Sequence, residues 1–90
     1  MNTEKRIWRL AATFPTLHTR MRDAAPGEIV PALKQCSVSN AGDGAKQAAL
    51  FCLWVWDAHT YSFDLYNAWG YWDSEHRDAW SKWATEPFWL

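Results

Sequence analysis

The stretch that decides the fold lies between residues 45 and 56 and reads AKQAALFCLWVW. Ten of its twelve residues are apolar, so none of its faces is polar and it has to be buried. Turn and capping residues precede it, and Asp57 and His59 follow it. The apolar run also suits a buried strand, but its length and the helix formers at its start favour a helix with Asp43 as N-cap. We therefore predict a buried central helix.

Apolar residues at helical spacing predict further helices before this one. Thr3 is a suitable cap for the first, and Pro15 is expected to end it. In order along the chain, we predict a helix over residues 3–14, a weaker helical segment over 17–25, a helical turn or two over 28–36, and an exposed, mobile loop over 37–44.

Two more helices are predicted after the central one, over residues 63–70 and 74–84. Gly70 suits the end of the first, and Asp73 is expected to cap the second. In the second, Ala79, Trp80 and Trp83 are expected on the inner face, and Asp78 and Lys82 to form an ion pair on the outer face. The pattern as a whole predicts one all-α domain, residues 1–90, with four to five short helices around the buried central helix.

The composition also bears on where the protein acts. The longest uncharged apolar run, residues 48–56, is about half the roughly 20 residues that a membrane helix needs. The charged N-terminus lacks the apolar block of a secretion signal. We expect a cytoplasmic protein that does not enter membranes, with Cys36 and Cys52 reduced and buried.

Residues for chemistry are few. His18, His59 and His76 come from separate segments and lack the spacing of a metal site. The chain has no glycine-rich phosphate loop and no serine or cysteine in a nucleophile setting. Asp73, His76 and Arg77 lie within one helical turn, which suits either an acid/base cluster or an N-cap with an Asp73–Arg77 pair, and we favour the second. The sequence thus predicts a protein that is not an enzyme and needs no cofactor or metal.

Basic residues are concentrated near the N-terminus. Residues 1–50 carry a net charge of +3 and residues 51–90 a net charge of −4. Together with Trp8 as a base-stacking ring, the basic residues would suit a nucleic-acid-binding face, which is the alternative hypothesis for function. The residues of this face would be Lys5, Arg6, Arg9, Arg20 and Arg22.

Tryptophan is the unusual feature of the composition: the chain has eight, seven of them in the last 37 residues. Each ring buries on the order of 150–250 Å², and a domain of this size has a small interior. The rings either build a tight core for a short chain or remain in part at the surface. On the second reading we expect at least two aromatic side chains near the C-terminus to be exposed and covered by a partner protein or a second copy, with Trp89 the most accessible. The predicted partner-binding residues are Trp69, Trp72, Trp80, Trp83, Phe88 and Trp89.

The same region carries a resemblance. The residues that carry it are Phe63-Asp64-Leu65-x-x-Ala68-Trp69-x-x-Trp72-Asp73, followed by His76-Arg77, Ala79-Trp80, Trp83-Ala84 and Pro87-Phe88-Trp89. This pattern resembles the C-terminal part of short uncharacterised proteins carried by bacterial phages and other mobile elements. The resemblance covers the last third of the chain. It implies a small accessory protein that binds and blocks, or adapts, a host protein, and anti-defence inhibitors are one such class. Our hypothesis from sequence is a small protein–protein interaction module.

Overall fold

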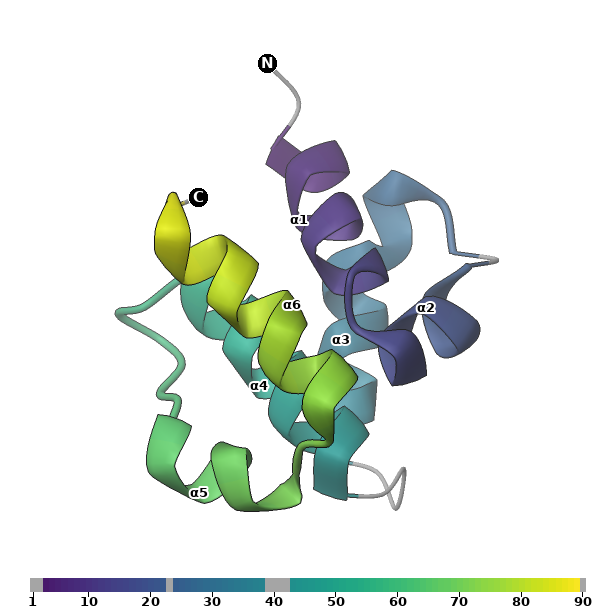
Figure 1. The fold of residues 1–90 in the computed structure, drawn as a ribbon. Coiled ribbons are helices and arrows are strands. Elements are labelled where there is room, and N and C mark those ends of the chain that lie inside the picture. The colour runs from purple at the N-terminus through teal and green to yellow at the C-terminus, as the bar shows by residue number, and fades with distance from the viewer. Residues whose placement is uncertain (1–2, 23, 39–42, 90) are drawn as a thin grey trace.

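The computed structural model describes residues 3–22, 24–38 and 43–89, and these residues form helices without any strand (Figure 1). The prediction of a small all-α domain is confirmed, with six α-helices in the described residues where four to five were expected. The helices are α1 (Thr3–Ala12), α2 (Pro15–Met21), α3 (Ile29–Val38), α4 (Asp43–Trp56), α5 (Leu65–Tyr71) and α6 (Ser74–Thr85), with a single 3-10 turn at Pro26–Glu28 before α3.

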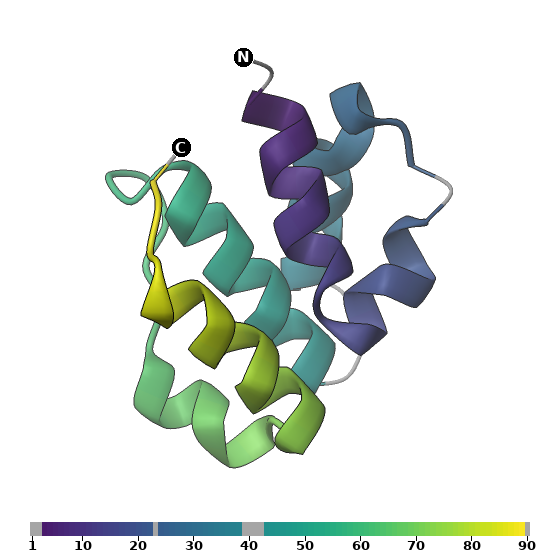
Figure 2. The same ribbon diagram turned by 45° about the horizontal axis from the view of Figure 1, so that its top comes forward.

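Helix α4 is the centre of the domain, as predicted. Helices α1, α2 and α3 lie on one side of it and α5 and α6 on the other (Figures 1 and 2). Phe51, Leu53 and Val55 are almost completely buried, and Phe51 contacts rings from both sides of the domain. Because α4 is apolar on most faces, it is stable only when helices cover it on several sides. The arrangement of the other elements follows from that requirement.

The chain turns sharply between α1 and α2. Helix α1 ends at Ala12, two residues earlier than expected, because Phe14 precedes Pro15 and takes an extended conformation (φ −91°, ψ 120°). The amides of Thr13 and Phe14 donate hydrogen bonds to the last carbonyls of α1, 3.1 Å each. Pro15 then starts α2, where its missing N–H costs nothing. The turn places the Phe14 ring fully inside the core.

The region around the predicted loop is more helical than expected. Helix α3 continues through Ser37 and Val38, and α4 begins at Asp43, so residues 37, 38, 43 and 44 of the predicted loop are helical. The Ser37 hydroxyl donates to the carbonyl of Lys34 (2.8 Å), so this residue satisfies a backbone group within the last turn instead of ending the helix. The rest of that loop, residues 39–42, lies outside the described residues. Asp43, predicted as the N-cap, is the first helical residue of α4, so the cap position is residue 42, which also lies outside the described residues.

Helices α5 and α6 both begin at an aspartate cap. The Asp64 carboxylate accepts from the amide of Asn67 (3.3 Å), and Asp73 accepts from the amide of His76 (2.9 Å), which confirms the predicted role of Asp73. Gly70 lies in the last turn of α5, one residue before the helix ends at Tyr71. The expected ion pair on the outer face of α6 is absent, because Asp78 and Lys82, both exposed and described, do not come within ion-pair distance. Within the described residues no helix is long and apolar enough to cross a membrane.

Candidate functional site

Trp72 is a core residue, so its prediction as a partner contact is wrong. Its side chain is 3% exposed and packs against the rings of Phe14 (5.4 Å between centroids) and Phe63 (5.8 Å). The indole N–H donates to the carbonyl of Gly44, 3.1 Å away, at the start of α4. Trp72 follows the end of α5 in extended backbone, which turns its ring toward the interior. It joins α5 to α4 and does not reach the surface.

Trp83 is also part of the core, which corrects a second predicted contact. Its ring is 9% exposed and meets Phe51 edge to face at 5.0 Å. The indole N–H donates to the carbonyl of Phe88 (3.1 Å), so Trp83 holds the segment after α6 against the domain. A ring that fills the core and satisfies its only donor internally offers little to a partner.

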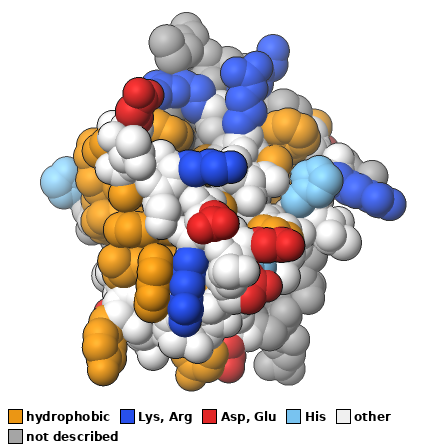
Figure 3. Space-filling view, in the orientation of Figure 1, with side chains coloured by type: hydrophobic (Ala, Val, Ile, Leu, Met, Phe, Trp, Pro, Cys, Tyr) orange, Lys and Arg blue, Asp and Glu red, His pale blue; other side chains and the backbone are white. Residues whose placement is uncertain are grey.

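Trp69 and Trp80, in contrast, line an open apolar groove between α5 and α6. The two rings meet edge to face with their centroids 5.8 Å apart. The α5–α6 groove consists of Leu65, Tyr66, Trp69, Gly70 and Trp80 and has a volume of about 640 Å³. Tyr66 is 91% exposed, and a side chain placed at Gly70 would meet no atom within 4 Å. Figure 3 shows hydrophobic side chains gathered in a column on the left of this face of the molecule.

Arg77 fixes the position of Trp69. Its Nε and Nη2 atoms donate to the backbone carbonyl of Trp69, at 3.2 and 2.7 Å, and its guanidinium lies over the Trp69 ring at 5.2 Å. The expected pairing of Arg77 with Asp73 is therefore wrong. Because the last carbonyls of a helix have no partner within it, a cation at the end of α5 stabilises that end. The result is a rigid indole at the rim of the groove.

The C-terminal pair of predicted contacts lies apart from this groove. Phe88 is partly buried, with the guanidinium carbon of Arg6 5.0 Å from the centre of its ring. Trp89 is 54% exposed, the most accessible of the six predicted contacts, yet its ring packs edge to face on Trp54 (4.7 Å) and Trp83 (5.6 Å). Trp89 thus covers the core with one part of its ring and leaves the rest exposed.

The predicted basic face is spread over several adjoining hollows. Arg6 and Arg9 line a groove of about 420 Å³ between α1 and α6. Arg9 also lines, with Lys5, a depression beside Ala24, and Arg22 lines a third hollow beside His18. The side chain of Arg20 lies outside the described part of the structure. Trp8, expected to stack on a base, is partly buried and donates its indole N–H to the carbonyl of Ala24 (3.1 Å). Its ring serves the contact between α1 and the segment before α3.

A histidine on α6 joins two distant segments. His76 is 4% exposed, its Nδ1 lies 2.7 Å from Asp73 Oδ1, and its Nε2 lies 2.8 Å from the hydroxyl of Thr16. A carboxylate can only accept, so Nδ1–H donates to Asp73, and the second ring nitrogen, Nε2, shares a hydrogen bond with the Thr16 hydroxyl, which can either donate or accept. The order carboxylate, imidazole and hydroxyl is that of a hydrolytic triad. Here Thr16 lies in the first turn of the seven-residue helix α2, and the grooves described above are lined by other residues, so the cluster is best explained as a link between α2 and α6.

This link gives a stability prediction. Thr16→Val removes the hydroxyl and leaves Nε2 of the buried His76 without its partner. We expect the free energy of unfolding to fall by about 1–3 kcal/mol in urea titrations. The control is Thr19→Val, because Thr19 is exposed and its hydroxyl bonds only to the backbone of the same helix. Equal losses in the two variants would contradict the role of Thr16.

The same cluster predicts an acid-sensitive contribution to stability. Hydrogen bonds from the backbone amide and then the side chain of His76 lower the pKa of Asp73. A carboxyl whose pKa is lower when folded stabilises the fold above its unfolded pKa, about 3.9, and loses that contribution as the pH falls through the folded value. The melting temperature of Asp73→Asn should therefore drop less between pH 5 and pH 2.5 than that of the parent protein. Asp78→Asn is the control, because Asp78 lies on α6 but has no such hydrogen bonds among the described residues, and its melting temperature should fall as much as that of the parent. An equal fall in the melting temperatures of Asp73→Asn and Asp78→Asn would contradict the prediction.

The two cysteines are buried and carry free thiols, in agreement with the sequence analysis. Burial raises the pKa of the Cys52 thiol well above its usual range, and the nearby Cys36 raises it further. A thiol held neutral in this way is a poor nucleophile. In the stretches that the structure describes, no group of three or more histidine, cysteine or acidic residues is placed to hold a metal ion.

Sequence reasoning missed Tyr66, the most exposed large apolar residue among those described. The signal was present: in a helix with Leu65, Ala68 and Trp69 on its inner stripe, the position after Leu65 points about 100° away from that stripe. An aromatic residue there has to face outward.

Scanned against models of protein families, and compared with curated proteins and with solved structures, the chain gives no match.

Proposed function

We propose that this protein is a small binding module that contacts a partner protein through the α5–α6 groove. The observation that carries the proposal is the exposure of a rigid aromatic cluster. Tyr66 stands almost fully in solvent, and Trp69 and Trp80 are only partly covered. Tyrosine and tryptophan are the residue types most enriched at interface hot spots, and soluble domains rarely leave such a surface uncovered without a function.

The groove has the features that a protein contact needs. Its aromatic side chains have few rotatable bonds, so they lose little conformational entropy on binding. Gly70 leaves the backbone of α5 open to a partner side chain. Arg77 already holds Trp69 in place, which reduces the cost of ordering the site when the partner arrives. These features favour a partner that inserts apolar side chains.

The acidic charge of the C-terminal half of the chain indicates what flanks those apolar side chains in the partner. Asp64 precedes the groove residue Leu65, and Asp73, Glu75 and Asp78 lie at the N-terminal end of α6, all of them exposed. Residues 51–90 carry a net charge of −4. Complementary charge steers association and suppresses wrong partners. We therefore propose an apolar partner segment with basic residues beside it.

The resemblance of the C-terminal third to short phage and mobile-element proteins supplies the biological setting of the proposal. In that setting the partner is a host protein in the bacterial cytoplasm, which this chain inhibits or adapts, as an anti-defence protein does. The alternative, nucleic-acid binding by the N-terminal basic residues, receives less support, because the indole N–H of Trp8 is bonded to the carbonyl of Ala24 and the basic residues are spread over several hollows instead of one groove.

The test is capture from a nuclease-treated bacterial lysate with three baits: the parent chain, Tyr66→Ala and Val38→Ser. Val38 is the matched control, since it is 82% exposed on α3, on the other side of α4. A protein retained by the parent and by Val38→Ser, and lost with Tyr66→Ala, supports the proposal. A protein retained equally by all three baits contradicts it, and so does a protein that the parent captures from an untreated lysate but not from the nuclease-treated one.

A further inference from the structure

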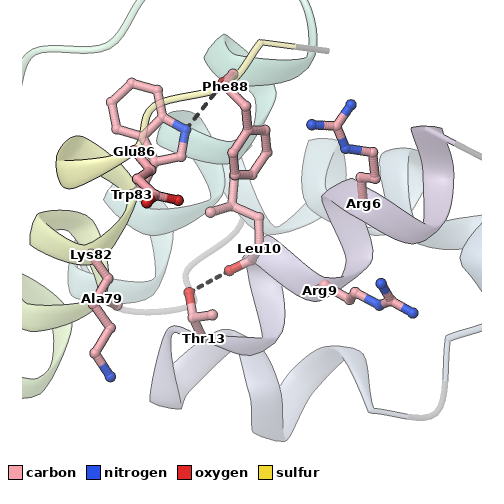
Figure 4. A pocket seen from close by; sticks show the side chains of 9 residues that line it. All are labelled: Arg6, Arg9, Leu10, Thr13, Ala79, Lys82, Trp83, Glu86 and Phe88. Carbon is pink, nitrogen blue, oxygen red and sulfur yellow. Dashed lines mark hydrogen bonds between the residues drawn. The ribbon is translucent and has the colours of Figure 1, made fainter.

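A second groove, between α1 and α6, combines positive charge with an apolar floor. The α1–α6 groove is formed mainly by Arg6, Arg9 and Leu10 of α1, Lys82 and Trp83 of α6, and Phe88. Figure 4 shows Leu10 and Phe88 between the α6 side chains on one side and the two arginines of α1 on the other. None of its residues lines the α5–α6 groove.

The cations of this groove form no ion pair with an acidic group in the described part of the chain. Arg6 and Arg9 are one helical turn apart and so line the same face of α1. Among the residues that the structure describes, no carboxylate forms an ion pair with Arg6, Arg9 or Lys82. Glu86 also lines the groove, so the three cations and this one acid leave a net charge of +2. An open groove with uncompensated guanidinium groups attracts an anion.

The floor of the groove is apolar but offers no row of open rings on which successive bases could stack. Leu10 is 5% exposed, and the Trp83 ring is covered by other core rings. One face of Phe88 is covered by the guanidinium of Arg6, 5.0 Å from the ring centre, so this ring has only its other face and its edge for a ligand. Binding of single-stranded nucleic acid needs open aromatic faces on which bases stack. The groove therefore favours a compact anionic group joined to an apolar body that lies along the floor.

We infer that the α1–α6 groove binds a small amphiphilic carboxylate, such as an aryl carboxylate. A guanidinium binds the two oxygens of a carboxylate through parallel hydrogen bonds, and Arg6 and Arg9 each offer this fork. The volume of about 420 Å³ is within the range of pockets that hold small molecules. Apolar contacts with Leu10 and Phe88 hold the body of the ligand. This site is independent of the proposed protein contact.

The experiment uses 2-naphthoate as the probe and the indole N–H resonance of Trp83, identified with Trp83→Phe, as the reporter in ¹⁵N NMR titrations. We expect 2-naphthoate to shift this resonance and to bind at least tenfold more tightly than the neutral analogue 2-naphthylmethanol. Inorganic phosphate, which has charge but no apolar body, should bind at least tenfold more weakly than 2-naphthoate. Arg9→Gln, which changes an exposed side chain, should lower the affinity for 2-naphthoate about tenfold, whereas Lys34→Gln on α3 should leave this affinity unchanged.

Several results would overturn this inference. One is that 2-naphthylmethanol or phosphate binds as tightly as 2-naphthoate. Another is that Arg9→Gln and Lys34→Gln weaken the binding of 2-naphthoate equally. A third is that 2-naphthoate shifts the indole N–H resonance of Trp69 and not that of Trp83. Arg6→Gln serves as a second variant, because it also removes the cation from the face of Phe88. It should weaken 2-naphthoate at least as much as Arg9→Gln does, and unchanged affinity in both variants would contradict the assignment. Failure here leaves the α5–α6 proposal untouched, since that proposal is tested with other residues.

Discussion

Replacing Phe51 with alanine is expected to lower the free energy of unfolding by about 3–5 kcal/mol, the largest stability effect that we predict. Phe51 is completely buried at the middle of α4. Its ring contacts Phe14 (5.7 Å), Phe63 (5.2 Å) and Trp83 (5.0 Å), which come from the two sides of the domain and from the chain after α4. Removing it opens a cavity that large neighbouring rings cannot fill by small movements.

Thermal unfolding measures this effect directly. A domain of this size is stable by about 5–15 kcal/mol, and each 1 kcal/mol corresponds to roughly 4–8 °C, so the melting temperature should fall by about 12–40 °C. Leu50→Ala is the control, because Leu50 is the preceding residue of α4 and is only partly buried. If the two variants lost equal stability, α4 would not be organised around Phe51.

The second large effect concerns binding. Trp69→Ala should weaken the binding of the captured partner by 2 kcal/mol or more, which corresponds to an increase in Kd of about thirtyfold, measured by calorimetry with the purified partner. Trp69 presents a ring that is held by Arg77 and Trp80 at the rim of the α5–α6 groove. Its backbone carbonyl, which accepts from Arg77, remains in the alanine variant, so α5 keeps that contact.

Trp89→Ala is the matched comparison, since it also removes a partly exposed indole but lies outside the α5–α6 groove. A loss confined to Trp69→Ala places the contact at the groove. A loss confined to Trp89→Ala would place it at the C-terminal segment, which was the most accessible position expected from the sequence, and would contradict the α5–α6 proposal.

The fold was largely predictable because its signals are local. The apolar run of α4, the proline after Phe14 and the cap at Asp73 each depend on residues within one or two turns, and each has the predicted role in the structure. The extent of α3 was underestimated because Pro31 and Ser37 suggested early breaks. Pro31 lies in the first turn of α3, where a proline is tolerated, and Ser37 bonds back to Lys34.

The roles of the tryptophans could not be derived in the same way. Trp72 falls at helical spacing from Leu65, yet it lies beyond the end of α5 and reaches the core through extended backbone. Trp69 is on the inner stripe of α5 but is only partly covered, because α5 is short and lies at the edge of the domain. Both outcomes depend on packing between segments, which the periodicity of one helix does not determine.

The α1–α6 groove was unpredictable for a related reason. It brings Arg6 and Arg9 against Trp83 and Phe88, residues from opposite ends of the chain. From the sequence, Arg6 and Arg9 were expected to bind nucleic acid, and Trp83 and Phe88 were expected to bind a protein. Their proximity is a product of the fold, and no spacing in the sequence encodes it.

The most direct test of the central claim, that the α5–α6 groove is the partner-binding site, is cross-saturation NMR of the complex with the unlabelled partner. The indole N–H signals of Trp8 and Trp72 are internal references, because both groups donate to backbone carbonyls inside the domain. We predict that saturating the partner reduces the Trp69 and Trp80 signals and leaves those of Trp8 and Trp72 unchanged. Loss of intensity at Trp8, with Trp69 and Trp80 unaffected, would contradict the claim.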